Sequence, residues 1–465
     1  MNFAKTAVLS VTAFLCAITT HAQERHIIGT LETFNGTNGG SPYGTLMRSK
    51  DGNLYGTTSG GGAHSSGTIF EVTTNNVFTN LASFAITNGS FPPCKLLEAT
   101  NGSFYGITYV GGTNGLGSIF QFTTNHVIKH IFSFNGTNGA YPWGGMVQAS
   151  NGNIYGTTST GGPAFSNFGG GNGTIFVLTT NGVVSNLYNF TNGIDGSTPY
   201  GGLIEGTNGD LYGTTFSGGT NGGGTLFRWK LDPGLDVVFG FGGGNGSGPT
   251  AVTRGHDGRL WGITAESGTH DFGTLYATTY TGILTVEHQF AGPPDDGATP
   301  YGPLHCCGCD YYGTTFGGGC SSNGTLYKIS AIRNSLTVRY DLFHSFTGGT
   351  DGSQPEAGVT SDLYGNLWGV TTDAANSQGT LYQIFTRPRV EQFLVQNGAL
   401  TGQLEDVNPG VSVQWQYSHT LLPDSWTDLS PPTLTFSNRL NFNFTVGSQH
   451  EYFRTQITFP PGFSF

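Results

Sequence analysis

The stretch "NLYGTTSGGG" at residues 53–62 decides the fold, because close copies of it recur along most of the chain. An aromatic residue followed by glycine marks each copy. These aromatic residues are Tyr55, Tyr105, Tyr155, Tyr212, Trp261, Tyr312 and Trp368. Successive copies are 50, 50, 57, 49, 51 and 56 residues apart. Seven copies at a period near 50 residues predict a repeat architecture, either a solenoid or a propeller.

Each copy contains the same series of segments. A proline comes first, often with an aromatic residue and a glycine, as in "PYG" at 42–44. A short apolar segment then leads to an Asp-Gly or Asn-Gly pair, which favours a tight hairpin because both residues accept positive φ. The motif strand, a glycine-rich loop, a segment such as "GTIF" and a strand ending in phenylalanine follow. Four strands joined as a meander are typical of a β-propeller blade, whereas a parallel β-helix would show a shorter period.

The two ends of the repeat complement each other. The segment "HIIGTLETF" at 26–34 ends in the phenylalanine of a fourth strand, but no earlier strands precede it. The last copy, at 367–385, lacks a fourth strand. Pairing these two segments would close the ring and remove both exposed sheet edges. We therefore expect an all-β, seven-bladed propeller of four-stranded blades over residues 26–386, whose last blade is completed by the N-terminal strand.

The repeated motif is explained by packing. Leu54 and Tyr55 point to opposite faces because side chains alternate along a strand. Gly56 is expected to leave room for an aromatic ring from the next blade. Thr57 and Thr58 are β-branched and suit a strand. We interpret the motif as structural, since no catalytic group is expected to recur in all seven blades.

The composition excludes several classes of protein. The 465-residue chain contains 77 glycines, 13% aromatic residues and only 10% charged residues, a balance opposite to that of disordered chains. The net charge is −11, and no basic patch is present, which argues against nucleic acid or an anionic membrane as a partner. The first 22 residues combine Lys5, an apolar core from Ala7 to Ile18 and a small-residue site at Ala22. They are expected to form a secretory signal peptide, so the mature chain is expected outside the cell or at its surface, without a transmembrane helix.

Residues 26–386 resemble the GloVer tandem repeat of bacterial secreted proteins. The resemblance is clearest in "FNGTNGAYPWGGMVQASNGNIYGTTSTGG" at 134–162 and "FTNGIDGSTPYGGLIEGTNGDLYGTTFSGG" at 190–219. The resemblance implies a propeller of unassigned function in an exported protein, and it implies no catalytic residue. The fifth and seventh copies depart most, because Thr250 and Glu356 follow the proline in place of an aromatic residue.

A different pattern begins after residue 386. Residues 390–465 contain alternating segments such as "VSVQWQYS" at 411–418 and "RLNFNFTV" at 439–446, followed by "YFR" at 452–454. Six or seven short strands over about 75 residues suit an immunoglobulin- or fibronectin-like β-sandwich.

Two groups of residues are candidates for a site on the face that carries the longest loops. Tyr43, Trp143, Tyr200 and Tyr301 follow prolines, and their rings are candidates for stacking on a sugar; alternatively, each ring fills the space where its first strand begins. Glu266, His270 and Asp271 in the fifth copy are the candidates for acid–base catalysis. Asp295 and Asp296 in the next loop are the candidates for holding a divalent cation as a cofactor. The alternative for all five is a solvated acidic loop.

Cys306, Cys307, Cys309 and Cys320 lie in one copy. Cys-x-x-Cys suits zinc or redox chemistry, but disulfides form readily in an exported chain, so a local disulfide is preferred.

Three functions remain open at this stage. The first is a non-enzymatic binding or scaffold protein, expected to be monomeric, with a glycan or surface polymer as partner. The second is an enzyme acting on an extracellular polysaccharide through the acidic loops of the fifth copy. The third is a purely structural surface repeat.

Overall fold

The computed structural model describes residues 6–11, 26–165, 170–231, 234–308, 310–331, 338–375 and 377–386, and the strands within 389–458. The chain divides into two compact units. The larger consists of Glu32–Asp362 with Trp368–Tyr382, and the smaller of Met1–Leu31, Leu363–Leu367 and Gln383–Phe465. The described residues are almost entirely β-structure; their one helical segment is the short 3-10 turn η1 (Gly243–Asn245).

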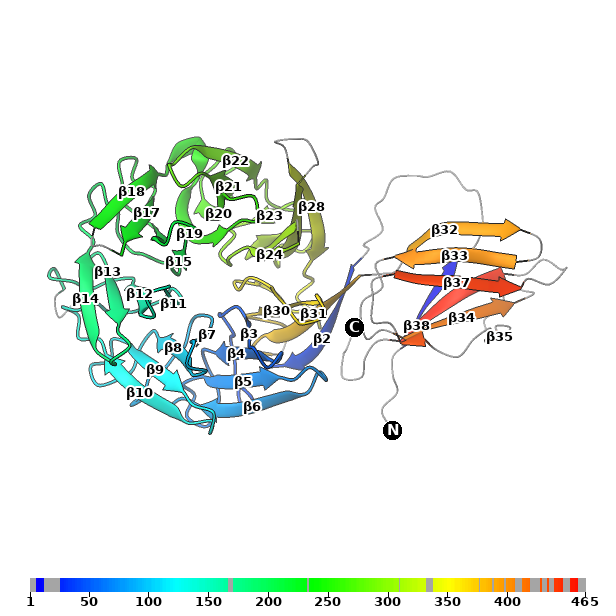
Figure 1. Cartoon of the computed structure of the whole chain (residues 1–465), viewed down its shortest axis with the longest axis horizontal. Helices are drawn as coiled ribbons and strands as arrows, with labels where there is room; N and C mark the ends of the chain where they lie inside the picture. The colour runs from blue at the N-terminus through cyan, green and yellow to red at the C-terminus, as the bar shows by residue number, and fades with distance from the viewer. Residues whose placement is uncertain are drawn as a thin grey trace. The chain divides into compact units, whose positions relative to one another are not determined.

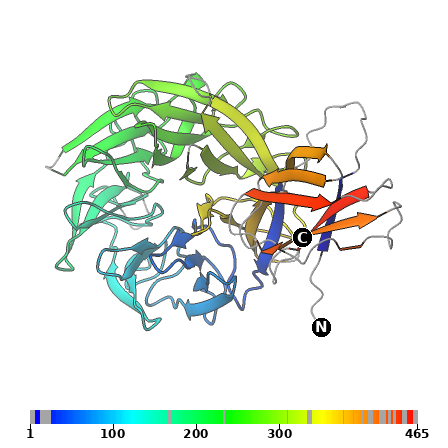
Figure 2. The same cartoon turned by 45° about the vertical axis from the view of Figure 1, so that its right-hand side comes forward.

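Seven four-stranded antiparallel sheets follow one another around a ring, as Figure 1 and the turned view in Figure 2 show. The first four blades run in chain order. Blade 1 is β3 (Met47–Arg48), β4 (Leu54–Thr58), β5 (Thr68–Val72) and β6 (Phe78–Ser83). Blade 2 is β7 (Leu97–Glu98), β8 (Phe104–Thr108), β9 (Ser118–Phe122) and β10 (Ile128–Ser133). Blade 3 is β11 (Val147–Gln148), β12 (Ile154–Thr158), β13 (Thr174–Leu178) and β14 (Val184–Asn189). Blade 4 is β15 (Ile204–Glu205), β16 (Leu211–Thr215), β17 (Thr225–Lys230) and β18 (Gly234–Gly240).

The remaining blades keep the same plan, and the last one closes the ring. Blade 5 is β19 (Ser247–Arg254), β20 (Leu260–Glu266), β21 (Thr274–Thr278) and β22 (Leu284–Gln289). Blade 6 is β24 (His305–Cys307), β25 (Asp310–Thr315), β27 (Thr325–Ala331) and β28 (Val338–Ser345), with a small accessory pair of β23 (Gly297–Ala298) and β26 (Gly317–Gly318). Blade 7 is β29 (Thr360–Ser361), β30 (Leu367–Thr371), β31 (Thr380–Thr386) and the N-terminal β2 (His26–Thr33). The predicted seven-bladed propeller, including its closure by the N-terminal strand, is confirmed.

The hydrophobic core lies between neighbouring blades. One cluster joins Tyr55 and Phe84 of blade 1 to Leu96 and Phe120 of blade 2, and similar clusters join the following blades. All five residues of β4 are buried, as expected for a strand covered on both faces. Each blade therefore depends on its neighbours for the burial of its apolar surface.

The glycine of the motif makes room for a ring of its own blade. Gly56 lies opposite Phe70 in the register of β4 and β5, and a Cβ atom at Gly56 would be 2.3 Å from Cζ of Phe70. The expectation that this ring comes from the next blade is wrong. The ring belongs to β5, the neighbouring strand of the same blade, and lies across the motif glycine of β4. The same pairing recurs in every blade, between Gly106 and Phe120, Gly156 and Phe176, Gly213 and Phe227, Gly262 and Tyr276, Gly313 and Tyr327, and Gly369 and Tyr382.

The second threonine of the motif also has a structural partner. Its hydroxyl pairs with the hydroxyl that begins the third strand, and each of these buried oxygen–oxygen distances is 2.7–2.9 Å. The pairs are Thr58 with Thr68, Thr108 with Ser118, Thr158 with Thr174, Thr215 with Thr225, Thr264 with Thr274, Thr315 with Thr325, and Thr371 with Thr380. In blade 4, Oγ1 of Thr225 further donates to the carbonyl of Asp195 in the loop that enters the blade. The repeated threonines thus fix the loops that approach the centre of the ring.

The described strands of the C-terminal part form two sheets. One contains β32 (Arg389–Gln396), β33 (Ala399–Glu405) and β37 (Arg439–Thr445). The other contains β1 (Thr6–Val11), β34 (Ser412–Ser418), β35 (Thr427–Asp428), β36 (Thr433–Leu434) and β38 (Tyr452–Thr458), with β1 antiparallel to β38. The packing of these strands as a β-sandwich stays a prediction. The predicted cleavage after Ala22 lies outside the described residues and also stays a prediction. No helix in the described ranges has the length and apolar character needed to cross a membrane.

Candidate functional site

A cavity of about 530 Å³ lies at the centre of the ring, where the first strands of the blades begin. All seven blades contribute the residue that follows their first proline. These residues are Tyr43, Pro93, Trp143, Tyr200, Thr250, Tyr301 and Glu356. The four aromatic residues predicted to bind a ligand therefore line one cavity, although they are far apart in the sequence.

A repeated joint between blades places these residues. The residue before each proline has a positive φ of 49–62°, and its N–H donates to a carbonyl of the preceding blade. The hydrogen bonds join Ser41 to Gln378, Phe91 to Ser66, Tyr141 to Leu116, Thr198 to Asn172, Gly248 to Gly223, Thr299 to Phe272 and Gln354 to Asn323, at 2.7–3.1 Å. Positive φ is unusual for a β-branched residue such as Thr299, so the surrounding structure must hold it.

The proline completes the joint by packing on a glycine of the preceding blade. At Gly67 a Cβ atom would be 2.8 Å from Cδ of Pro92, and at Gly379 it would be 2.8 Å from Cδ of Pro42. The second contact joins blade 7 to blade 1, so the joint continues across the closure. Because both sides of the joint are tight, the residue after the proline is directed to the cavity in every blade.

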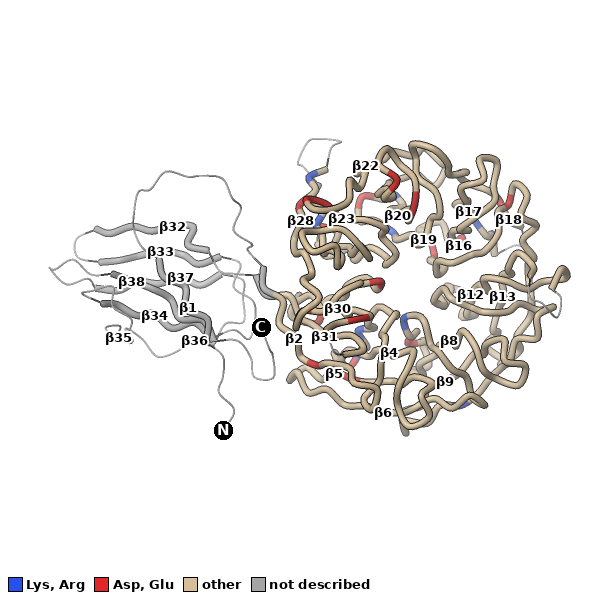
Figure 3. The backbone as a smooth tube through the Cα atoms, turned by 180° about the vertical axis from the view of Figure 1, so that it is seen from behind, with Lys and Arg blue, Asp and Glu red and all other residues tan. Residues whose placement is uncertain are grey.

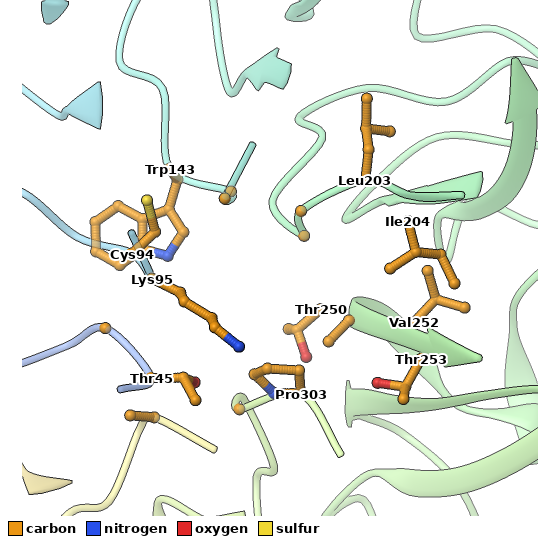
Figure 4. Close-up of a pocket in the computed structure, with 18 of the residues that line it drawn as sticks. Thr45, Cys94, Lys95, Trp143, Leu203, Ile204, Thr250, Val252, Thr253 and Pro303 are labelled. Carbon is orange, nitrogen blue, oxygen red and sulfur yellow. The ribbon is translucent and has the colours of Figure 1, made fainter. Parts of the chain in front are cut away.

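Three of the predicted aromatic residues form one cluster. Trp143 and Tyr200 are stacked, with ring centroids 5.0 Å apart and an interplanar angle of 28°. Tyr43 contacts Trp143 edge-on at 6.0 Å. Phe91 and Tyr109 join this cluster through contacts to Trp143 at 6.0 and 5.3 Å. Trp143 projects beside the cavity in Figure 4. The cluster offers a continuous aromatic surface on one side of the cavity.

A carboxyl group and tyrosine hydroxyls share the same space. Burial raises the pKa of Glu356 to about 7. Burial also raises the pKa of Tyr200, and the negative charge of Glu356 contributes next. The pKa values of Tyr43 and Tyr301 are also raised, first by burial and then by the negative charge of Glu356. In the described part of the chain, the carboxylate of Glu356 has no hydrogen-bond or ion-pair partner. The carboxyl group is thus free to bond to a molecule in the cavity.

Replacing Glu356 by glutamine is expected to stabilise the protein at pH 8 but not at pH 4.5. The pKa of Glu356 is raised above its value in the unfolded chain, so ionisation in the folded state lowers stability as the pH rises from about 4.5 through 7. Removal of that charge should increase the free energy of unfolding at pH 8 by about 2 kcal/mol, allowing for the part of the side chain open to the cavity. Urea unfolding of both proteins at the two pH values measures this. An equal difference at both pH values would contradict it, and Asp295→Asn, at an exposed carboxylate outside the cavity lining, is the control.

Lys95 and His305 bring basic groups to the cavity. The side chain of Lys95 extends into it in Figure 4. Burial lowers the pKa of Lys95, and the positive charge of Arg48 contributes. Burial lowers the pKa of His305 to about 4, with further contributions from Lys95 and Arg48, and Nε2 of His305 is buried without a hydrogen-bond partner in the described structure.

The acidic residues predicted for catalysis lie mostly away from the cavity lining. Glu266 is exposed at the end of β20, and His270 and Asp271 are exposed in the loop that follows. Of these three, Glu266 has an electrostatic effect on the cavity, because its charge contributes to the raised pKa of Tyr301 after burial and Glu356.

Asp296, predicted to hold a cation with Asp295, is engaged within the protein. Its carboxylate bonds to Nε2 of His288 at 2.8 Å, to the hydroxyl of Tyr340 at 2.6 Å and to the backbone N–H of Ala291 at 2.9 Å. Asp195 and Asp351 accept equivalent backbone bonds in their own blades, which indicates a repeated loop-closing role. Asp295 is exposed. Within the described ranges, no three His, Cys, Asp or Glu residues are grouped as a metal site would require.

The described cysteines lie in two places, beside the cavity and in blade 6. Cys307 and Cys320 are free thiols, and Cys94 is a free thiol beside the cavity. A local disulfide that involves Cys309 stays a prediction. Sγ of Cys306 lies 3.6 Å from Nδ1 of His256. Cys309 lies outside the described residues. The pKa of Cys94 is raised to about 12 by burial, so its thiol is protonated at neutral pH.

Sequence reasoning missed Lys95, His305 and Glu356 as cavity residues. The signal for Glu356 and Lys95 is visible when the seven copies are aligned on their prolines. Glu356 occupies the position of Tyr43, and Lys95 lies two positions beyond Pro93, which also occupies that position. A charge at positions that are otherwise uncharged indicates a function beyond packing.

Solved structures share the fold at low sequence identity. The extracellular domain of a putative hybrid two-component system of B. thetaiotaomicron matches with a TM-score of 0.53 and 11% identity, over 91% of this chain and 56% of that one. A second such domain matches with a TM-score of 0.50 and 12% identity, over 93% and 55%. A putative 6-phosphogluconolactonase from Bacteroides uniformis matches with a TM-score of 0.49 and 13% identity, over 84% and 100%.

The chain spans about half the length of the two extracellular domains, and at these identities the likeness shows the fold alone. No curated protein matches the sequence. The model of the Gloeobacter/Verrucomicrobia repeat matches residues 15–205 and 165–385, in agreement with the resemblance seen in the repeated motif. The chain belongs to the Gloeobacter/Verrucomicrobia repeat family.

Proposed function

We propose that this protein is an exported module that binds carbohydrate in its central cavity without transforming it. The observation that carries the proposal is the convergence of Tyr43, Trp143, Tyr200 and Tyr301 on one cavity together with the unpartnered carboxyl group of Glu356. Aromatic faces offer apolar surface to the C–H groups of a sugar ring, and hydroxyl and carboxyl groups bond to its hydroxyls.

The same groups do not by themselves assemble a catalytic pair. Glu205, the second carboxylate of the lining, accepts hydrogen bonds from the backbone N–H of Ser150, and Asp296, His270 and Asp271 are not among the cavity residues. A binding role uses the aromatic surface directly, whereas a hydrolytic role needs two carboxyl groups placed across the bond to be broken. Binding is therefore preferred over the enzymatic alternative.

An extracellular location is part of the proposal. The segment expected to be a signal peptide supports it, and so does the shared fold of two extracellular domains. A sandwich in residues 390–465 would be a second module of the exported protein.

Replacing Trp143 by alanine is expected to weaken binding of a saccharide roughly 10- to 100-fold, because this ring is the centre of the aromatic cluster. The full chain would first be screened on a glycan array and the best saccharide titrated by tryptophan fluorescence or calorimetry. Trp143→Phe should retain most of the affinity, and Ile283→Ala, at a residue that is 70% exposed and outside the cavity lining, should retain all of it. Equal affinity of a folded Trp143→Ala variant, or no binding of any saccharide by the unchanged protein, would overturn the proposal.

A further inference from the structure

Lys95 has no counter-ion, although it lies in the interior of the ring. Its ammonium group projects into the cavity (Figure 4), and no carboxylate of the described residues forms an ion pair with it. Lys95 is an exposed residue and its side chain is open to the water of the cavity, so an anionic group of a ligand there can reach its ammonium group. An uncharged saccharide would leave this group uncompensated.

The surroundings of Lys95 are positive, in contrast to the net charge of −11 for the whole chain. Arg48 is close enough to lower the pKa of Lys95, and Arg254 lines the same cavity. Figure 3 shows that Lys and Arg are sparse around the ring and that some of them lie near its inner edge. The lining also contains Glu205 and Glu356, so the positive charge is confined to the part of the cavity around Lys95. This part of the cavity is therefore suited to an anion.

The acidic residues of the cavity do not neutralise Lys95. The carboxylate of Glu205 accepts two hydrogen bonds from the backbone N–H of Ser150, at 3.0 and 3.1 Å. Glu356 follows its proline directly, and Pro93 is the equivalent residue in blade 2. Lys95 lies two positions beyond Pro93, so the side chains of Glu356 and Lys95 start at different levels of the cavity. The aromatic cluster and Glu356 thus form one part of the cavity, and Lys95 provides a separate positive group.

We propose that the ligand is an acidic saccharide and that Lys95 binds its carboxylate or sulfate. This inference rests on the proposed carbohydrate-binding function and assigns the chemical class of the ligand. The sugar ring lies against the aromatic cluster, and the oxyanion accepts charge-assisted hydrogen bonds from the ammonium group. The positive charges of Arg48 and Arg254 favour the same orientation.

An array of matched saccharides tests the inference with the full chain. It carries uronate oligosaccharides beside their carboxyl-reduced forms, and sulfated oligosaccharides beside their desulfated forms. The unchanged protein is expected to prefer the acidic member of at least one pair roughly 10- to 100-fold. Lys95→Met should abolish this preference while retaining weak binding of the neutral member, and Lys95→Arg should preserve it. Lys129→Met, at an exposed position of β10, is the control for a general loss of positive charge.

Each outcome decides a separate point. Equal binding of acidic and neutral members would overturn the inference and leave the carbohydrate-binding function intact. A preference that persists in Lys95→Met would remove Lys95 from the site. Failure of the unchanged protein to bind any saccharide would overturn the proposed function and the inference with it. Thermal unfolding of Lys95→Met, which removes an unpaired cation, should show a fold at least as stable as that of the unchanged protein.

Discussion

A variant that lacks residues 26–34 is expected to lose most of the stability of the ring, with a decrease of about 5 kcal/mol or more in the free energy of unfolding. Strand β2 supplies the fourth strand of blade 7. Phe34 is fully buried, its ring lies 5.5 Å from that of Phe70, and its N–H donates to the carbonyl of Gly379 at 2.9 Å. Deletion would remove this packing and expose the edge of β31. Thermal and urea unfolding of the two proteins measure the loss.

The segment supplied as a separate peptide should restore stability, since its role is to complete a sheet. A peptide with the sequence of residues 26–34 is expected to bind the shortened protein and raise its melting temperature. The same peptide with alanine in place of Phe34 serves as the control, because it retains the backbone but lacks the buried ring. An unchanged melting temperature after deletion would show that the ring does not depend on this closure.

Replacing Gly56 by alanine is expected to lower the free energy of unfolding by about 3 kcal/mol. A Cβ atom at this position would be 2.3 Å from Cζ of Phe70 and 2.7 Å from Cδ2 of Leu46, and both neighbours are buried. Neither side chain can move without displacing others in the core between the blades. Urea unfolding of the variant measures the effect.

Gly60 provides a matched control in the same blade. A Cβ atom there would have its nearest neighbour, the carbonyl oxygen of Gly40, at 3.7 Å, which is an ordinary contact. Gly60→Ala should therefore change the free energy of unfolding by less than about 1 kcal/mol. Equal effects of the two substitutions would contradict the assignment of Gly56 as the position that makes room for the ring.

The fold could be predicted from the sequence because the same pattern of strands and turns occurs seven times. The period, the turn residues and the unmatched strands at the two ends together imply the number of blades and the closure. The origin of the ring beside Gly56 could not be predicted, because a side-chain pattern gives the face of a strand but not which neighbour covers that face. Strand register supplied that information.

The candidate site was predictable only in part. Tyr43, Trp143, Tyr200 and Tyr301 share a sequence position, and the ring brings equivalent positions together. An alignment of the copies marks Lys95 as an unusual charge, but the sequence does not show that the positions after each proline face one cavity. His305 begins β24, so its place depends on the register of β24 with β25. The role of Asp296 was hidden for another reason, since Tyr340, one of its partners, is 44 residues away.

The joint before each cavity residue has a consequence for how such proteins diversify. It consists of a backbone N–H, a carbonyl and a proline ring on a glycine, so the side chain that follows the proline has no part in it. This chain already carries Tyr, Pro, Trp, Thr and Glu at that position. A new ligand specificity can therefore arise by single-codon changes at seven places around one axis, while the scaffold that presents them stays the same.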